Sequence, residues 1–411
     1  MTSASVRPVM DSESGADASS TFLRQIDEIV PILKANAAET EKLRRLPDAS
    51  IQALTDAGVF RAGMPKRWGG TEIDPVPWYE AVVRIGTACP SSAWIAGVVG
   101  GHSWHAAMFP DEAQHDLWAK GEDVRIATSF APTGKVERVK GGFQLSGRWK
   151  FLSGVDHSEW IIVGGIVPDD GNGPEYRSFM LPASGFAIDQ DSWQVEGLQG
   201  TGSKEVDIDC FVPEYRTQTI EEVYNGTEPG KVLNTGPIFQ LPWLSRFSYA
   251  VAMPAVGALQ GAIDAFIEDN RSRVSALTHK AAAENTTLHV RLAEASIIAR
   301  DTRARIVTTW SDMYETVKAG GQISAEARVR CRFEGAYAVA QCLDAAMKIF
   351  QISGGGVMDK SKPFQRYLRD IMGMRNHPFN VYETWAPLHS SALLGSPPAP
   401  PLMRHSMGCL L

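Results

Sequence analysis

The hydrophobic period of this chain changes twice, and these changes restrict its fold more than any other feature. Up to about residue 124, apolar residues recur every three or four positions, which is the spacing of an amphipathic helix. From about residue 125 the spacing becomes two, as in the stretch 142–152, where apolar residues alternate with Gln144, Ser146, Arg148 and Lys150. Long helical patterns return from about residue 239. Helices, then a sheet, then more helices predict an α+β protein rather than alternating β-α-β units.

The same changes divide the chain into five parts. The first 20 residues are rich in Ser, Asp and Ala and predict a disordered tail, and residues 396–411, rich in Pro, predict an extended tail. Between the tails we expect an N-terminal α-helical domain over 21–124, a middle β-barrel-like domain over 125–238 and a C-terminal four-helix bundle over 239–395.

The composition argues against several classes of function. Lys and Arg total 40 against 47 Asp and Glu, so a net charge of −7 offers no basic surface for a nucleic acid. No run approaches the roughly 20 apolar residues of a membrane span, so no membrane partner is expected. The five cysteines form no C-x-x-C pair, which argues against a disulfide framework or a zinc module. These features favour a soluble cytoplasmic enzyme.

Generic catalytic motifs are missing from the sequence. There is no Gly-x-x-x-x-Gly-Lys phosphate loop and no Gly-x-Ser-x-Gly elbow, and the Gly-rich run 197–202 precedes a strand pattern rather than a helix. His102 and His105 stand three apart, with His115 and Asp111 nearby, but no carboxylate matches them in metal-site spacing. We therefore expect no metal; one of the two rings would face a cavity while the other packs or faces solvent.

Four segments occur in the order in which the acyl-CoA dehydrogenase fold carries its signatures. They are PKRWGG at 65–70, GGFQLSGRWKFLSGVDHSEW at 141–160, GLQGTGSKEVDIDCFVP at 197–213 and IFQISGGGVMDKSKPFQRYLRD at 349–370. The chain resembles that fold over roughly residues 25–390. The resemblance implies an N-terminal helical domain, a middle β-domain and a C-terminal four-helix bundle, in agreement with the hydrophobic period.

The chain departs from the dehydrogenases of this fold where their catalytic carboxylate stands. Those enzymes end the last signature with an I-Y-E-G-T string, whose Glu removes the substrate α-proton. Here His377 and Pro378 occupy that offset, and Glu383 follows about five residues later. Without a placed base, α,β-oxidation cannot begin.

These departures resemble the oxygenase components of two-component flavin-dependent monooxygenases, such as the p-hydroxyphenylacetate, phenol and indole hydroxylases. The strings GGHSWHAAMFP at 100–110, ATSFAPTGKVERVKGGFQLSGRWKFLSG at 127–154 and RNHPFN at 375–380 carry the resemblance. It implies an enzyme that receives reduced FMN or FAD from a separate NAD(P)H-dependent reductase. With O2 it would form a C4a-hydroperoxyflavin and hydroxylate a small aromatic substrate of the phenol or indole type. A homotetramer, as a dimer of dimers, is expected by analogy.

The resemblance assigns catalytic roles to three side chains. Ser153 would place its hydroxyl near flavin N5, unless it only caps a turn. His102 shares a helix stripe with Trp94 and would contact the substrate hydroxyl, with a core histidine as the alternative. Trp94 would line the same substrate pocket. His377, in the position of the missing base, would orient the hydroperoxide or the substrate, unless it caps a helix.

Four further residues are candidates for contacts with substrate or cofactor. Ser129 would be a second polar group near both, unless its hydroxyl bonds the backbone. Trp149 would flank the isoalloxazine ring or else pack in a core. Arg271 resembles the bundle arginine that reaches a flavin phosphate, often across a dimer interface, although a helix arginine is commonly solvated. Gly355 belongs to the Gly-rich signature that follows the third long helical pattern.

Three other functions stay open at this point. A flavin-dependent N- or S-oxygenase of the same fold would act on an amino sugar or a thiophene sulfur. An acyl-CoA dehydrogenase with a relocated base, such as Glu383, would retain oxidised FAD. A scaffold without enzymatic activity would keep the fold and bind no reduced flavin.

Overall fold

The computed structural model describes residues 15–121, 123–168, 171, 173–274 and 279–396. The first helix begins at Gly15, so the expected N-terminal tail is wrong for residues 15–20, which are helical. No Gly or Pro interrupts residues 16–30, and each residue added to an existing helix gains a backbone hydrogen bond. The rest of that tail, and residues 397–411 of the expected C-terminal tail, lie outside the described residues.

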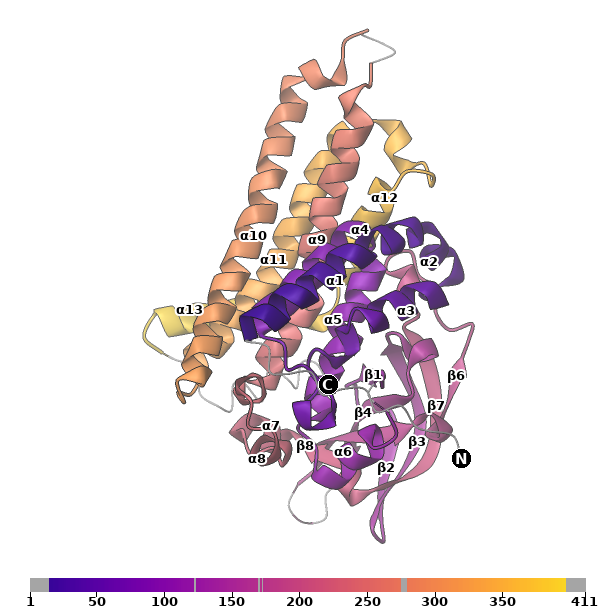
Figure 1. Ribbon diagram of the computed structural model, residues 1–411, viewed down its shortest axis with the longest axis vertical. Coiled ribbons are helices and arrows are strands. Elements are labelled where there is room, and N and C mark those ends of the chain that lie inside the picture. The colour runs from indigo at the N-terminus through magenta and orange to yellow at the C-terminus, as the bar shows by residue number, and fades with distance from the viewer. Residues whose placement is uncertain (1–14, 122, 169–170, 172, 275–278, 397–411) are drawn as a thin grey trace.

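Helices form the N-terminal part of the molecule (Figure 1). They are α1 (Gly15–Ala35), α2 (Ala37–Leu43), α3 (Asp48–Asp56), α4 (Pro75–Ala88), α5 (Pro90–Ala106) and α6 (Asp111–Trp118). Helix α5 is buried along nearly its whole length, because its sequence is small and apolar on every side. It packs against α4 and later helices on one side and against the first strand on the other.

The middle of the chain forms two four-stranded sheets that pack face to face around their own apolar core. One sheet has the order β1 (Ile126–Ser129), β4 (Trp160–Val167), β5 (Glu175–Pro182), β8 (Thr217–Thr219). The other has the order β2 (Lys135–Val139), β3 (Gly142–Leu152), β7 (Lys204–Pro213), β6 (Phe186–Asp189). Strands β1 and β4 are parallel, and the remaining neighbours are antiparallel.

Strand β3 changes register near its end. The pairing with β7 is regular as far as Trp149 and shifts before Leu152, and Phe151 adopts a left-handed φ of 65°. This irregularity reverses the alternation: Trp149 is fully buried, whereas Phe151 is 68% exposed. The alternation expected over 142–152 is therefore wrong at Phe151, which would otherwise face the same side as Trp149. Ser153, which follows the shift, is buried.

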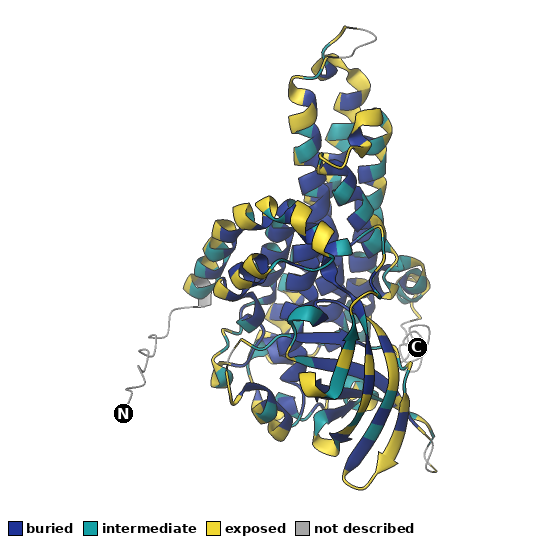
Figure 2. Ribbon diagram, turned by 90° about the vertical axis from the view of Figure 1, so that its right-hand side faces the viewer, coloured by how far each residue is buried: buried dark blue, intermediate teal, exposed yellow. Residues whose placement is uncertain are grey.

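The C-terminal part is helical again, so the predicted α+β order is confirmed. Two short helices, α7 (Ile220–Asn225) and α8 (Gly230–Leu233), precede α9 (Trp243–Arg271), α10 (Thr286–Lys318), α11 (Ala325–Ile352), α12 (Phe364–Arg375) and α13 (Tyr382–Leu393). Figure 1 shows α9, α10 and α11 side by side, extending beyond the rest of the molecule. Figure 2 shows that burial is densest where these helices meet the N-terminal helices and the sheets.

Helix α9 is the central element of the packing and contacts α4, α5, α10, α11 and α12. Within the described residues it is also the one helix long and apolar enough, by length and composition, to cross a membrane, and 78% of its most apolar window is buried in the molecule.

Helices α5 and α9 touch through their backbones. A Cβ at Gly97 of α5 would lie 2.4 Å from the carbonyl oxygen of Ala250 on α9. The same helix, α9, approaches α4 at Gly257, where a Cβ would lie 2.3 Å from the carbonyl oxygen of Val83. These close approaches set the separation of α5 and α9, on which the geometry of the side chains between them depends.

We predict that Gly97→Ala forces α5 and α9 apart. The added methyl meets a backbone oxygen that cannot move away, so the free energy of unfolding should fall by about 1–3 kcal/mol, measured by chemical denaturation. Gly335→Ala on α11 is the matched control, because a Cβ there meets its nearest neighbour at an ordinary 3.6 Å. Equal stability of the two variants would contradict the prediction.

Candidate active site

A chain of hydrogen-bonded side chains connects α5 with the loop before β7. Trp94 Nε1 donates to Ser153 Oγ over 3.0 Å. Ser153 Oγ lies 2.8 Å from Ser203 Oγ, which lies 2.6 Å from Thr201 Oγ1. Thr201 Oγ1 donates to the carbonyl oxygen of Leu198 over 2.9 Å. All these side chains are buried, so the chain is shielded from water.

The groups at the two ends of this hydrogen-bonded series determine which way every hydroxyl in it donates. An indole N–H only donates and a carbonyl oxygen only accepts. Because Thr201 gives its proton to the carbonyl of Leu198, it accepts from Ser203, which in turn accepts from Ser153. The hydroxyl hydrogen of Ser153 is therefore engaged inside the protein. Its oxygen keeps one lone pair for a further donor.

Helix α12 holds the loop that carries this chain. Asp370 Oδ1 accepts the N–H of Leu198 over 2.6 Å, and Leu198 adopts a left-handed φ of 57°. A Cβ at Gly197 would lie 2.2 Å from the carbonyl oxygen of Arg369, so loop and helix backbones touch. Burial raises the pKa of Asp370 to about 7. The positions of Thr201 and Ser203 thus depend on a helix some 170 residues away in the sequence.

His102 is buried with both ring nitrogens engaged. Nδ1 lies 2.7 Å from the carbonyl oxygen of Ile126, which only accepts, so Nδ1 carries the hydrogen. Burial lowers the pKa of His102 to about 4, and the ring is neutral near pH 7. Nε2 is then an acceptor, and it takes the hydroxyl of Thr128 at 3.0 Å.

Aromatic rings surround His102. Phe247 of α9 stacks on it with ring centroids 6.0 Å apart, and Phe130 presents an edge at 6.3 Å. Trp243 stacks on Phe247 in turn, at 5.5 Å and an interplanar angle of 9°. A small cavity is lined by His102, Trp243, Arg246 and Phe247, among others. The imidazole acceptor is thus set among aromatic rings that suit a flat ring, with the buried Arg246 in the same lining.

His377 completes the group around Trp94. Its ring meets Trp94 edge-on at 5.4 Å and lies 6.3 Å from Phe247. Its Nδ1 accepts the N–H of Phe379 over 3.3 Å, so it also caps the short helical turn Pro378–Asn380. Burial lowers the pKa of His377 to about 4, which leaves it neutral near pH 7. The structure therefore brings Trp94, Ser153 and His377 together.

His105, the other histidine of α5, packs among other side chains and does not face Trp94, Ser153 and His377. Its Nε2 lies 3.1 Å from Gln218 Oε1, and its ring contacts Phe109 and Trp243. The described part of the chain holds no cluster of three or more His, Cys, Asp or Glu side chains that could bind a metal ion.

Two predicted contact residues point elsewhere. The hydroxyl of Ser129 donates to the carbonyl oxygen of Lys150 over 2.7 Å, and it is Thr128 that reaches His102. Neighbouring residues of a strand face opposite sides, so only one of the two can face α5. Trp149 lies fully buried between the sheets and donates to the carbonyl oxygen of Gly164 over 2.8 Å, which is the packing expected of a core residue.

Arg271 and Gly355 lie at the far end of the bundle. Arg271 is the last residue of α9, some 36 Å along the helix axis from Phe247 at 1.5 Å per residue. Its side chain is 73% exposed and pairs with Glu268 at 3.6 Å. Gly355 begins the turn after α11, and a side chain there would meet open space. Within one chain, neither residue joins the group around Ser153.

Glu383 is not placed as a base. Both of its carboxylate oxygens accept from Arg375 Nη2, at 2.7 and 2.9 Å, and its side chain is 55% exposed. The dehydrogenase alternative that used Glu383 therefore loses its catalytic residue.

Several residues of this site escaped prediction from the sequence. Thr201 and Ser203 lie in the segment 197–213, which was singled out as a family signature, but their link to Ser153 crosses 50 residues. Ser129, and not its neighbour Thr128, was predicted to lie near the substrate. Nothing in the sequence distinguishes Phe247 from the other apolar residues of its long helix.

The buried histidines predict a loss of stability in acid. The folded His105 has a pKa lowered to about 3 by burial, against 6.5 for a free ring, so only the unfolded chain takes up a proton as the pH falls below 6.5. Each such ring should contribute a slope of about 1.4 kcal/mol per pH unit between about pH 4 and 6. His105→Gln should reduce that slope by about one proton, measured by denaturant titrations across pH. An unchanged slope would contradict the assignment.

Comparison with known proteins assigns the chain to a family. The model of the acyl-CoA dehydrogenase C-terminal domain matches residues 249–382. The chain is 36% identical over 377 residues to the oxygenase subunit HsaA of a flavin-dependent monooxygenase from Rhodococcus jostii (strain RHA1), covering 91% of this chain and 98% of the relative. It is 31% identical to the oxygenase component of the FADH2-dependent resorcinol hydroxylase of Rhizobium sp. (strain MTP-10005), covering 90% and 93%.

The fold agrees with a solved relative. The crystal structure of 3-HSA hydroxylase from Rhodococcus sp. RHA1 superposes with a TM-score of 0.88 at 36% identity, covering 92% of this chain and 98% of that one. The predicted resemblance is confirmed: the chain is a flavin-dependent monooxygenase and belongs to the oxygenase components of the two-component enzymes built on the acyl-CoA dehydrogenase fold.

Proposed function

We propose that this enzyme hydroxylates a phenol-type aromatic ring bound between His102 and the Trp94–Ser153–His377 group. The observation that carries the proposal is the tautomer of His102. Its Nδ1–H is bound to the carbonyl of Ile126, and its neutral Nε2 is an acceptor in an aromatic wall. A phenol O–H that donates to Nε2 gains negative charge on its oxygen, which makes the ring a better nucleophile.

Thr128 is the natural partner in this step. Its hydroxyl already donates to the single lone pair of Nε2, so a phenol O–H binds there by displacing the Thr128 hydroxyl. Because the pKa of His102 lies near 4, Nε2 stays unprotonated, and therefore an acceptor, over the whole neutral range. Phe130 and Phe247 provide apolar ring faces and exclude water from the reacting carbon.

The hydrogen-bond direction at Ser153 fits a reduced flavin. The bound reduced flavin supplies the electrons that activate O2. Its N5 carries a hydrogen, which the free lone pair of Ser153 accepts, whereas the N5 of an oxidised flavin is itself an acceptor and finds no donor there. Phe151, exposed at the end of β3 two residues before Ser153, is the aromatic side chain that we propose beside the isoalloxazine in place of Trp149.

The other contacts follow from the family. The two-component architecture implies a flavin reductase, for which we propose NAD(P)H as the electron source. The name of the resorcinol hydroxylase supports reduced FAD as the first carrier to test, with FMN as the alternative. If Arg271 and Gly355 contact the flavin, they do so from a second copy of the chain, and by analogy with the fold family we propose a dimer of dimers. We also propose a cytoplasmic location.

The proposal predicts that His102→Ala lowers hydroxylation roughly 100-fold or more. Anaerobic protein with reduced FAD, then with reduced FMN, is mixed with O2 and a phenol, and hydroxylated product and H2O2 are measured per flavin oxidised. The variant should still oxidise the flavin but release H2O2 instead of product. His115→Ala, an exposed histidine of α6, should match the wild type. If His102→Ala still forms as much hydroxylated product per flavin oxidised as the wild type, the proposed role of His102 is wrong.

The hydrogen bond from Ser153 to Ser203 predicts that its removal weakens the preference for reduced over oxidised flavin. Ser203→Ala removes the acceptor for the Ser153 hydrogen, which then turns outward as a donor. The ratio of reduced to oxidised flavin affinity should fall about tenfold, the value of one hydrogen bond to a mismatched partner, measured by equilibrium binding. Ser129→Ala is the control, because its hydroxyl bonds the carbonyl of Lys150 instead. If both variants keep the wild-type ratio, the assigned direction is wrong.

A further inference from the structure

The loop that precedes β7 is organised around the backbone groups of Leu198. The carbonyl oxygen of Leu198 accepts the hydroxyl of Thr201 at 2.9 Å and the backbone N–H of Thr201 at 3.1 Å. It also accepts the indole N–H of Trp193 at 3.3 Å. The carbonyl oxygen of Thr201 in turn accepts the N–H of Gly154, the neighbour of Ser153, over 2.8 Å. A rotation of the backbone at Leu198 would therefore reach Ser153 through side chains and backbone alike.

Leu198 has a backbone conformation that a leucine seldom adopts. Its φ of 57° lies in the left-handed region, which is unfavourable for a residue with a Cβ and persists only where the surroundings hold it. Asp370 of α12 supplies that support, because its Oδ1 accepts the N–H of Leu198 over 2.6 Å. On the same helix, Arg369 Nη1 donates to the carbonyl oxygen of Glu196 over 2.6 Å, and a Cβ at Gly373 would lie 3.3 Å from Leu198 Cγ. Helix α12 therefore maintains the conformation of the loop.

The cations nearest to Asp370 are engaged with another carboxylate. Arg366 Nε donates to Glu41 of α2 over 3.0 Å, and Arg369 pairs with the other oxygen of Glu41. Asp370 itself is 3% exposed, and within the described residues it forms no ion pair. The backbone N–H of Leu198, rather than a cation, is thus the group that meets this buried side chain.

We infer that Asp370 is a positioning residue: by holding Leu198 it fixes the direction in which Ser153 donates, and so sets the preference for reduced flavin. The inference rests on the proposed function. If the backbone at Leu198 rotates, the hydroxyl of Thr201 loses its acceptor and donates to Ser203 instead. Ser203 then donates to Ser153, whose own hydrogen turns toward the flavin. In that direction it meets the N5 of an oxidised flavin, which accepts, better than the N5 of a reduced one.

The strength of this contact depends on the charge of Asp370. Burial raises the pKa of Asp370 to about 7. An ionised carboxylate accepts an N–H more strongly than a neutral carboxyl group does. Above pH 7 the charged side chain should therefore hold Leu198 firmly, and below pH 7 the protonated one should hold it less well. The preference for reduced flavin should accordingly rise with pH through about 7.

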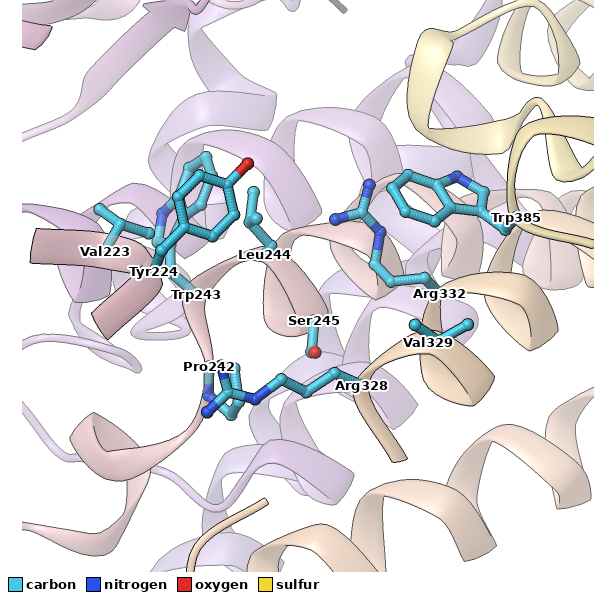
Figure 3. Close-up of a pocket in the computed structure, with 10 residues that line it drawn as sticks. All are labelled: Val223, Tyr224, Pro242, Trp243, Leu244, Ser245, Arg328, Val329, Arg332 and Trp385. Carbon is cyan, nitrogen blue, oxygen red and sulfur yellow. The ribbon is translucent and has the colours of Figure 1, made fainter. Parts of the chain in front are cut away.

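The other titratable groups around α12 keep one charge state between pH 6 and 8. Burial raises the pKa of Cys89 and that of Tyr367, so both stay neutral. Against the effect of burial, the hydrogen bonds from the two arginines of α12 lower the pKa of Glu41, which stays ionised. Burial lowers the pKa of His377 to about 4, so this ring stays neutral. Arg332 of α11 lines a cavity between α7, α9, α11 and α13 (Figure 3), and its pKa, lowered to about 9 by burial, leaves it charged.

The test is the ratio of reduced to oxidised flavin affinity, measured by anaerobic equilibrium binding of FAD, then of FMN, to the full-length protein between pH 6 and 8. Asp370→Ala removes the acceptor of the Leu198 N–H and should lower the ratio about tenfold at pH 8, as expected for Ser203→Ala. Asp370→Asn keeps a neutral acceptor of the same shape. Its ratio should equal that of the wild type at pH 6 and be about fivefold lower at pH 8. Comparison at each pH cancels the ionisation of the flavin itself.

Two further variants separate the charge of Asp370 from a general loosening of α12. Asp264→Asn is the matched control, because this carboxylate is exposed on α9, bonds Gln260 and acts on the same Tyr367 as Asp370 does. Its ratio should follow the wild type at every pH. Glu41→Gln removes a negative charge that raises the pKa of Asp370, so the pH at which the ratio changes should move downward. A purely structural role of α12 would leave that pH unchanged.

Three results would overturn the inference. A wild-type ratio in Asp370→Ala would show that Leu198 needs no such support. A ratio in Asp370→Asn that matches the wild type at both ends of the pH range would show that the charge has no effect, and this variant decides the question if the alanine variant does not fold. The same change in Asp264→Asn would make the effect unspecific. Failure of the proposed function is distinct, because Ser203→Ala would then keep the wild-type ratio as well.

Discussion

The contact of α5 and α9 through Gly97 and Ala250 is the constraint on which the rest of the site depends. Helix α5 carries Trp94 and His102, and α9 carries Phe247 and Trp243, so the separation of these two helices sets the distances between the two pairs. A side chain at Gly97 would have to occupy the position of a backbone oxygen. The glycine allows Phe247 of α9 to stack on His102 of α5 at 6.0 Å.

The hydrogen bonds of the site share one property: their hydrogens are directed into the protein. His102 gives its hydrogen to the carbonyl of Ile126, and Ser153 gives its own to Ser203, so Ser153 keeps a lone pair for a ligand and Nε2 of His102 is an acceptor that Thr128 occupies. Reduced flavin and phenols bring hydrogens of their own, at N5 and at the hydroxyl. Complementarity in donor and acceptor pattern is therefore what these two residues offer, beside a buried cation, Arg246, that lines the same cavity as His102.

The fold and part of the site could be predicted from the sequence. The change of hydrophobic period marked the sheet correctly, and the family strings pointed to Trp94, Ser153 and His377, which the structure places together. Trp149 could not be judged from alternation, because a register shift at the end of β3 separates it from Phe151. Nor could alternation say whether Thr128 or Ser129 faces α5, since a strand with both faces buried shows no polarity.

The sequence by itself determined which segments are helices and which are strands, because the periods of 3.6 and 2 are local and each segment carries its own. It also determined the family, since the signature strings are contiguous. Only the tertiary structure decided which hydroxyl meets Ser153 and how Asp370 holds the loop at Leu198. Those facts depend on side chains separated by tens to hundreds of residues. Their contact leaves no periodic trace in the sequence, because it arises only when the helices and sheets pack.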